Sequence, residues 1–243
     1  MIRQIFFLFF IFSLTTIFGL FAVVIGIIDI RGRFVGSLSR MYSRIVLWIS
    51  GVKYRVVGVE NLDINSHYIF TSNHESAFDI PLILGGLNFH IVFLAKKELK
   101  KIPILGWAMI VGRHIFIDRY NKKKAVLSLK EAKMSLSSNP RSLIIFPEGT
   151  RSKDGKIHQF KKGGLSIALD IGMDLVPLAV CGTAAVVAKK SFALNKGEIE
   201  LHIGKPIICS HWKGRPTIEL ADHLRNEVKA MKKTWKESIG EVN

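Results

Sequence analysis

Cysteine is nearly absent from this chain of 243 residues. The two cysteines, Cys181 and Cys209, are too few for a disulfide framework or a zinc ribbon, and we expect both to be buried, reduced and inert. The pattern G-x-S-x-G, which places a serine nucleophile on a sharp turn, is also missing. The sequence therefore excludes a disulfide-stapled scaffold and offers no serine hydrolase of that type.

Acidic residues are scarce as well. The chain has 19 aspartates and glutamates against 35 lysines and arginines, so its formal net charge is +16 and its pI is about 10.0. This surplus predicts an acidic partner, which is either nucleic acid or a membrane of anionic lipids. Because no recognisable nucleic-acid-binding motif accompanies the charge, we expect no nucleic acid and favour lipid or an acidic substrate.

A long apolar run stands at the beginning of the sequence. From Gln4 to Ile28 there is no charged residue. As a helix this run is about 37 Å long, enough to cross a hydrocarbon core of about 30 Å. A secretory signal peptide is the competing interpretation, because Arg3 makes a thin positive region. The run is longer than the apolar part of most signal peptides and lacks a small-residue cleavage site, so we expect a retained membrane anchor.

The next segment has the pattern of a basic amphipathic helix. Its apolar face is formed by Phe34, Val35, Leu38, Met41, Tyr42, Ile45, Val46 and Ile49. Its polar face is formed by Arg33, Ser37, Arg40, Ser43 and Arg44. Such a helix lies in the membrane interface or packs its apolar stripe on a soluble domain, and the two placements are compatible.

These two helices make residues 1–50 an N-terminal membrane anchor, which is followed by one catalytic domain over residues 51–243. If the first helix spans the membrane, the arginines at positions 31, 33, 40 and 44 outweigh Arg3 and place the catalytic domain on the cytoplasmic side. Gly19 and Gly26 leave open a helix that only dips into one leaflet.

From Val52 onward, short β-branched runs alternate with helical stretches. The predicted strands are Lys53–Val59, Tyr68–Ser72, His90–Leu94, His114–Ile117, Leu143–Phe146, Leu175–Val180 and Ile199–Ile203. The predicted helices are Phe78–Leu84, Lys122–Ser137, Gly164–Asp170 and Thr217–Ile239. This alternation predicts a single α/β domain with a mostly parallel or mixed sheet flanked by helices.

Polar clusters follow three of the predicted strands. His74 comes after YIFTS, Asp118 and Arg119 come after HIFI, and the stretch EGTR (148–151) comes after LIIFP. In open α/β sheets, ligands gather outside the carboxyl ends of the strands. We therefore expect the three clusters to converge on one site.

The stretch NHESAFD (73–79) starts like the zinc motif H-E-x-x-H, but Phe78 stands where the second histidine belongs. We therefore expect no metal and no cofactor. His74 and Asp79 instead suit general base catalysis, in which the carboxylate orients the imidazole and supports its protonated form. Ser76 and Ser166 lack the context of a nucleophile, so we expect direct attack by a substrate hydroxyl and no covalent acyl-enzyme.

These residues resemble the conserved blocks of the 1-acylglycerol-3-phosphate acyltransferase (lysophosphatidic acid acyltransferase) family. NHESAFD (73–79) is similar to its N-H-x-S-x-x-D block, with Glu75 where many members carry glutamine. FIDR (116–119), FPEGTRS (146–152) and VPLA (176–179) resemble its other blocks in the same order, and KKEL (96–99) also has a counterpart. The resemblance runs from about Val52 to about Gly204.

The resemblance implies a glycerolipid acyltransferase fold and one reaction. The free sn-2 hydroxyl of a lysophosphatidic acid attacks an acyl thioester, which gives phosphatidic acid. The resemblance makes His74 the base, with Asp79 as its partner.

The same resemblance implies the substrate contacts. It makes Arg119 and Arg151 the ligands of the glycerol phosphate, which suits the planar fork of arginine. Glu148 and Thr150 belong to the same loop, and Gly149 either lets the main chain approach the ligand or only makes a tight turn. Two further contacts are weaker. Lys97 either adds a phosphate contact or is simply solvated, and VPL (176–178) either lines the acyl side or is a buried strand.

Several alternatives stay open. The acyl donor is acyl-CoA or acyl carrier protein, and the acceptor is lysophosphatidic acid or another lyso-lipid of the same family's chemistry. A membrane-bound lipid or thioester hydrolase would reuse the His74–Asp79 pair with water and release free fatty acid. A non-catalytic lipid-binding protein would have no need of the pair.

Overall fold

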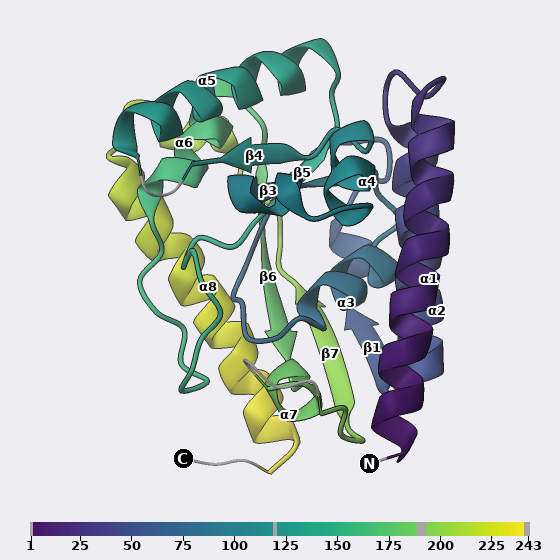
Figure 1. The fold of residues 1–243 in the computed structure, drawn as a ribbon. Helices are drawn as coiled ribbons and strands as arrows, with labels where there is room; N and C mark the ends of the chain where they lie inside the picture. The colour runs from purple at the N-terminus through teal and green to yellow at the C-terminus, as the bar shows by residue number, and fades with distance from the viewer. Residues whose placement is uncertain (1, 119–120, 189–192, 241–243) are drawn as a thin grey trace.

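A seven-stranded mixed sheet lies between two layers of helices in the computed structural model, which describes residues 2–118, 121–188 and 193–240 (Figure 1). The strand order is β1-β7-β6-β2-β5-β3-β4. The strands are β1 (Lys53–Val57), β2 (Ile69–Ser72), β3 (Ile91–Lys96), β4 (Ile115–Ile117), β5 (Ser142–Ile145), β6 (Leu175–Cys181) and β7 (Glu198–Ile203). All seven predicted strands are present.

The sheet is parallel except at one pairing. β6, β2, β5, β3 and β4 run parallel as neighbours, whereas β7 runs antiparallel to β6 and parallel to β1. The prediction of a mostly parallel or mixed sheet is confirmed. Because β2, β5, β3 and β4 point the same way, their carboxyl ends share one edge, where the polar clusters follow them.

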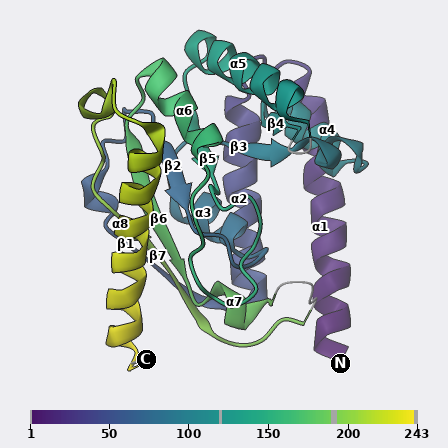
Figure 2. The ribbon, with the colours of Figure 1, turned by 90° about the vertical axis from the view of Figure 1, so that its left-hand side faces the viewer.

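The strands at the centre of the sheet bury both faces. In β2, Ile69 packs on one side and Phe70 on the other, and β5 repeats this with Leu143 and Ile144. Successive side chains of a strand point to opposite faces, so these continuous apolar runs need a helical layer on each side. One layer contains α5 (Lys122–Ser138), α6 (Lys162–Ile171) and α8 (Thr217–Ser238), and the other contains α1 (Ile2–Gly26), α2 (Arg33–Ser50) and α3 (Asp79–Gly86) (Figures 1 and 2).

Short elements escaped the sequence prediction. They are α4 (Leu105–Val111), α7 (Thr183–Val186) and the 3-10 turns η1 (Val59–Asn61), η2 (Lys97–Lys101) and η3 (Cys209–Trp212). The first predicted strand ends at Val57 because Gly58 adopts a φ of 88° and turns the chain into η1. These elements span one or two turns, which is too short for a helical repeat of apolar residues to appear.

The amphipathic face of α2 differs in part from the predicted one. Val35, Leu38 and Val46 are buried as expected. Phe34 and Met41, however, are 71% and 50% exposed, whereas Ser43 is buried beside Leu47. The buried face is rotated because α3 packs on that side of α2, where Leu47 reaches Gly85. The Ser43 hydroxyl is satisfied within the helix by donating to the Ser39 carbonyl at 2.8 Å.

α1 is the one described helix long and apolar enough to cross a membrane, over Gln4–Gly26 with a mean hydropathy of 2.6. It lies along the catalytic domain (Figures 1 and 2). Near its start, Phe7 packs against Phe78 with ring centroids 6.4 Å apart. Near its middle, the Thr15 and Tyr42 hydroxyls are 2.7 Å apart.

The second half of α1 packs on α4 through two glycines. A side chain at Gly19 would overlap Ile104, and one at Gly26 would overlap Val111. The two glycines therefore allow close contact between α1 and the catalytic domain. The opposite face of α1 is exposed and consists of residues such as Phe6, Phe9, Phe12, Ile17 and Val24.

Candidate active site

His74 lies just past the carboxyl end of β2, in the turn that leads into α3. Its Nδ1 is 2.6 Å from Oδ2 of Asp79, the first residue of α3. The Asp79 carboxylate accepts this bond, so Nδ1 carries the proton and Nε2 is the ring nitrogen left with a lone pair. Phe146 stacks on the imidazole at 4.1 Å between centroids and fixes the plane of the ring.

Asp79 is fully buried and is held from four sides. Besides His74, its Oδ2 accepts the backbone N–H groups of Glu75 at 2.7 Å and Ser76 at 3.0 Å. Its Oδ1 accepts a hydrogen bond from the hydroxyl of Thr183, the first residue of α7, at 2.5 Å. A buried carboxylate needs such donors, and here they also prevent it from turning away from the imidazole.

Ser76 has a structural place. Its hydroxyl is buried, donates to the Val187 carbonyl at 2.7 Å and accepts the Phe78 backbone N–H at 3.1 Å. Both bonds hold the turn between β2 and α3. The hydroxyl of Ser76 is therefore engaged with backbone groups of Val187 and Phe78.

The loop after β5 is bonded to the His74 turn. Glu148 accepts the His74 backbone N–H at 3.1 Å with one oxygen and the His158 backbone N–H at 3.1 Å with the other. Burial raises the pKa of the Glu148 carboxyl, although the two backbone hydrogen bonds act in the opposite direction. The Ser152 N–H donates to the His74 carbonyl at 2.7 Å. Glu148 is thus placed to order both loops.

The remaining predicted residues of this loop have different environments. Gly149 adopts a φ of 77°, so the tight turn by itself requires glycine. Thr150 is exposed, and Arg151 is half-buried, one residue before the Ser152 bond to the His74 turn. The predicted contact at Arg119 lies outside the described residues.

Lys97 and Asp118 form a second charged group farther along the same sheet edge. The Lys97 Nζ donates to the Asp118 carboxylate at 2.5 Å, and this hydrogen bond raises the pKa of Lys97. Lys97 directly follows β3, which stands two strands from β2 in the sheet order and therefore about 10 Å away, whereas Asp118 follows β4, which stands three strands and about 14 Å away. Lys97 is thus already paired, at a distance that suits a remote part of a substrate rather than the reacting atoms.

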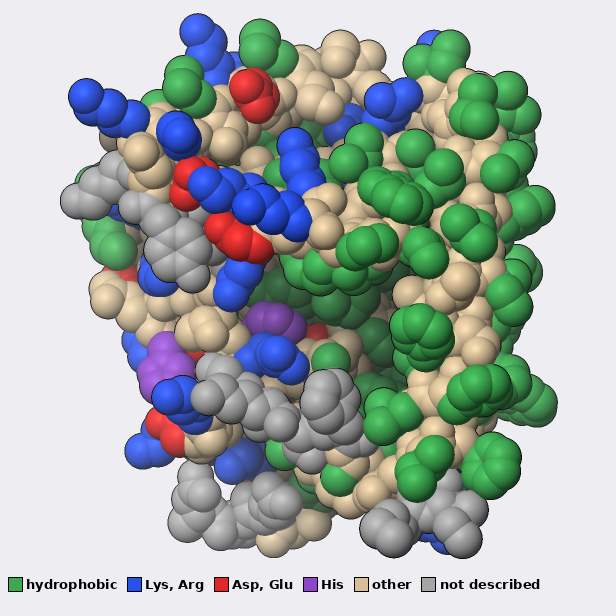
Figure 3. All heavy atoms as spheres, viewed as in Figure 1, with side chains coloured by type: hydrophobic (Ala, Val, Ile, Leu, Met, Phe, Trp, Pro, Cys, Tyr) green, Lys and Arg blue, Asp and Glu red, His purple; other side chains and the backbone are tan. Residues whose placement is uncertain are grey.

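The acyl-side residues predicted on β6 are part of the sheet core. Val176 and Leu178 are fully buried and belong to the apolar cluster that also contains Phe78 and Leu82. This placement favours the buried-strand interpretation over direct lining of an acyl site. The molecular surface is instead hollowed next to α1, where hydrophobic side chains gather beside lysines and arginines (Figure 3).

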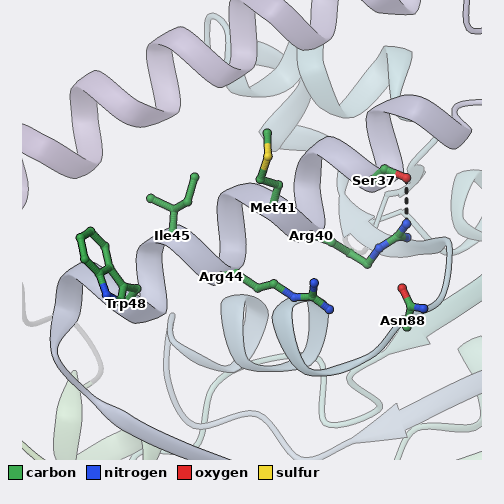
Figure 4. Close-up of a pocket in the computed structure, with 7 residues that line it drawn as sticks. All are labelled: Ser37, Arg40, Met41, Arg44, Ile45, Trp48 and Asn88. Atoms are coloured by element: carbon green, nitrogen blue, oxygen red, sulfur yellow. Dashed lines mark hydrogen bonds between the residues drawn. The ribbon is translucent and has the colours of Figure 1, made fainter.

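A shallow pocket of about 500 Å³ lies elsewhere, on the outer side of α2. Its lining residues are Ser37, Arg40, Met41, Arg44, Ile45, Trp48 and Asn88 (Figure 4). Arg40 donates to the Phe89 carbonyl at 2.8 Å and Arg44 to the Gly85 carbonyl at 3.0 Å, so both arginines fasten α2 to the end of α3. None of the predicted site residues lines this pocket, which lacks a general base.

Three contacts at the site were not predicted from the sequence. Thr183 reaches Asp79 across 104 positions of the chain, and Lys232 of α8 forms a buried ion pair with Glu75. Phe146 was part of a recognised block, but its stacking on His74 appears only in three dimensions. Among the described residues, no group of three or more histidine, cysteine, aspartate or glutamate side chains is arranged to hold a metal.

Comparison with known proteins gives one consistent family. The Acyltransferase family model matches residues 53–181. The 1-acyl-sn-glycerol-3-phosphate acyltransferase of Limnanthes douglasii is 34% identical over 76% of this chain and 62% of its own length. That of Cocos nucifera is 33% identical over 82% of this chain and 67% of its own length. This chain thus spans about two thirds or less of these curated relatives.

A relative of known structure covers the whole chain. The crystal structure of the 1-acyl-sn-glycerophosphate (LPA) acyltransferase PlsC from Thermotoga maritima is similar with a TM-score of 0.81 and 27% sequence identity. The match includes 100% of this chain and 96% of that one. The similarity therefore extends over the N-terminal helices as well as the sheet.

Proposed function

This chain belongs to the acyltransferase family, and from that premise we propose that it transfers a fatty acyl group from an acyl thioester to the sn-2 hydroxyl of lysophosphatidic acid. The product is phosphatidic acid, a precursor of phospholipids. One observation carries the proposal: His74 is held by Asp79 at 2.6 Å so that Nε2 remains to take a proton. The relatives named for this reaction support the choice of acceptor.

The chemistry requires no covalent intermediate. The His74 Nε2 removes the proton of the acceptor hydroxyl as its oxygen attacks the thioester carbonyl carbon. The carbon–sulfur bond then breaks, and the thiolate leaves with the proton that His74 returns. Asp79 keeps the imidazole in the required tautomer and stabilises its protonated form. The donor is acyl-CoA or acyl carrier protein, and the basic surface suits both.

We propose that two arginines, Arg119 and Arg151, bind the phosphate of the acceptor. Arg151 follows the Glu148 turn that is bonded to His74, and in the sequence Arg119 comes two positions after the last residue of β4. A guanidinium matches two phosphate oxygens at once, and holding the phosphate also orients the distant hydroxyl beside the base. Lys97 extends this positive edge, although Asp118 partly neutralises it.

The membrane placement follows from the two sides of α1. The catalytic domain covers one side from Phe7 to Gly26, so lipid can surround only the other side. We therefore place α1 within one leaflet, with the hollow beside it open to lipid substrates, and we place the domain on the cytoplasmic side. A membrane-impermeant label at the N-terminus then reacts from the same side as the domain. Reaction from the opposite side only would require a spanning helix.

The function is tested with purified protein in lipid vesicles. Acyl-CoA and acyl carrier protein donors are each combined with lysophosphatidic acid, lysophosphatidylcholine or monoacylglycerol, and the products are measured by mass spectrometry. We expect phosphatidic acid as the main product. Transfer to another acceptor would replace lysophosphatidic acid in the proposal, and release of free fatty acid without an acceptor would indicate a hydrolase.

A further inference from the structure

A lysine from the C-terminal helix lies buried between the two loops of the candidate active site. Lys232 of α8 is 8% exposed, and its ammonium forms an ion pair with Glu75, which is 4% exposed and follows His74 directly. The same ammonium donates to the Gly155 carbonyl at 3.2 Å, in the loop that continues from Glu148 and Arg151. One charged group thus contacts both loops.

Hydrogen bonds hold Glu75 in place on its side of this contact. The Asn73 amide donates to the Glu75 carboxylate at 3.0 Å and to the Val180 carbonyl of β6 at 2.9 Å. The Val180 N–H donates back to Asn73 at 2.9 Å. Glu75 is therefore tied to the sheet, and its backbone N–H is bound to Asp79. Any movement of Glu75 would displace His74 next to it.

The loop on the other side is contacted by α8 at its exposed turn. Gly155 adopts a φ of 70° in this turn, where the Asp154 carboxylate accepts the Lys156 backbone N–H at 3.1 Å. α8 contacts this loop twice, because Arg225 also donates to the Ile157 carbonyl at 3.2 Å. The Ser152 bond to the His74 carbonyl and the Glu148 bond to the His158 N–H join the loop to the His74 turn at its two ends, and the Lys232 bridge adds a contact between them at Gly155.

We propose that Lys232 is a positioning residue of the acyl transfer: its ammonium, buried between Glu75 and the Gly155 carbonyl, sets the His74 turn against the loop that carries Arg151. The inference rests on the proposed function, because it concerns the distance between the base and the phosphate-binding arginine. A small misplacement of a bound substrate lowers the rate strongly without removing any reacting group. A buried ion pair is a costly way to gain stability, so its presence here suits a role in geometry.

The test uses five variants of the full-length protein in vesicles. Lys232→Met removes the ammonium, Glu75→Gln removes the carboxylate, and the double variant removes both charges together. Lys229→Met, one turn earlier on the exposed side of α8, is the matched control. We expect Lys232→Met to lower kcat about ten- to a hundredfold with a smaller change in KM, and Lys229→Met to leave both unchanged. Lys232→Arg keeps the charge and should restore part of kcat.

The pH dependence of kcat/KM separates positioning from a merely structural contact. Asp79 and Glu148, the other acidic groups at His74, are unchanged in all variants. Lys232→Met leaves an uncompensated carboxylate beside His74, so the acidic limb of the profile should move up by roughly half a pH unit. Glu75→Gln leaves an uncompensated ammonium and should move the limb down. The double variant should return the limb to its wild-type place while kcat stays low.

Backbone hydrogen exchange tests, independently of activity, whether Lys232 holds the His74 turn and the Gly155 loop together. We expect segments 73–79 and 152–158 to exchange at least tenfold faster in Lys232→Met and in the double variant, but not in Lys229→Met. If Lys232→Met alone fails to fold, the double variant carries the test, because it has no unpaired charge. Wild-type kcat and wild-type exchange in a folded double variant would overturn the proposal. A wild-type protein that does not acylate lysophosphatidic acid would overturn the proposed function instead, and the exchange comparison would still decide whether Lys232 joins the loops.

Discussion

At the carboxyl edge of the sheet the chain buries polar groups, whereas along α1 it exposes apolar ones. Asp79 is fully buried and accepts four hydrogen bonds, and Glu148 accepts two. On α1, Phe9 and Phe12 are 69% and 73% exposed. Each arrangement by itself costs free energy in water. Burying a polar group without a hydrogen-bond partner is unfavourable, and so is exposing apolar surface to water.

The two regions offset this free-energy cost in different ways, which suggests a catalytic role for the sheet edge and a membrane-binding role for α1. At the sheet edge every donor comes from the protein itself, so the geometry of His74 is fixed before a substrate arrives, as efficient catalysis requires. Along α1 the exposed apolar side chains have no such partner within the described structure, and in the membrane placement that we propose a hydrocarbon environment supplies it. Substitutions at the sheet edge should therefore change turnover, and substitutions on α1 should change where the protein resides.

The largest expected effect comes from His74. Removing its imidazole with His74→Ala takes away the proton acceptor, and general base catalysis contributes roughly 10²- to 10⁴-fold. We expect kcat to fall by that factor while substrate binding and the melting temperature change little. His211→Ala is the matched control, because that histidine is exposed in η3 and belongs to neither loop of the candidate site. Near-normal turnover in folded His74→Ala protein would contradict the mechanism.

The next effect concerns phosphate recognition at Arg119 and Arg151. Replacing either with alanine removes a charge-assisted hydrogen bond of about 1.5–3 kcal/mol, so kcat/KM for lysophosphatidic acid should fall about ten- to a hundredfold. The loss should shrink for monoacylglycerol, which has no phosphate, and lysine should rescue only in part. An equal loss with both acceptors would mean that the arginines support the fold or the donor.

The sequence predicted the pairing of His74 with Asp79 better than it predicted the groups that support this pair. The strands were evident because apolar β-branched runs of four to seven residues alternate with helical stretches, and His74 and Asp79 stand five positions apart in one turn. Thr183 and Lys232 were missed because each meets its partner across more than 100 positions. A hydroxyl or an ammonium that bonds a distant carboxylate leaves no periodic pattern. Only the folded chain brings such pairs together.

The faces of the N-terminal helices were predicted only in part for a related reason. Periodicity locates an apolar stripe but does not tell whether protein or lipid covers it. In α2, Phe34 and Met41 belong to the predicted stripe yet are exposed, since α3 covers the side of Ser43 and Leu47 instead. The glycines of α1 left its placement open in the sequence, and their contact with α4 gives them a packing role.

A smaller effect is expected on the exposed face of α1. Phe9→Ser removes one apolar side chain from the proposed lipid contact, at about 1.5 kcal/mol, so partitioning into vesicles should fall about tenfold. Activity in detergent should remain near wild type, because Phe9 points away from the domain. Val126→Ser is the control, since Val126 is 65% exposed on α5 in the other helical layer. Equal partitioning of both variants would place the membrane contact elsewhere.

The last prediction is that removing metal ions does not change the transfer rate. Saturating EDTA should leave the transfer rate unchanged, compared with the same concentration of EDTA already loaded with magnesium. His74 donates through Nδ1 to Asp79, and the second position of a zinc helix is Phe78, which is buried against Phe7 instead of facing a ligand. The Asp79 carboxylate is itself occupied by four donors and has little left to offer a cation. Activity that disappears in free EDTA and returns with a divalent metal would show that the residues around His74 act through a bound ion. The protein's own donors would then not be sufficient to order the candidate site.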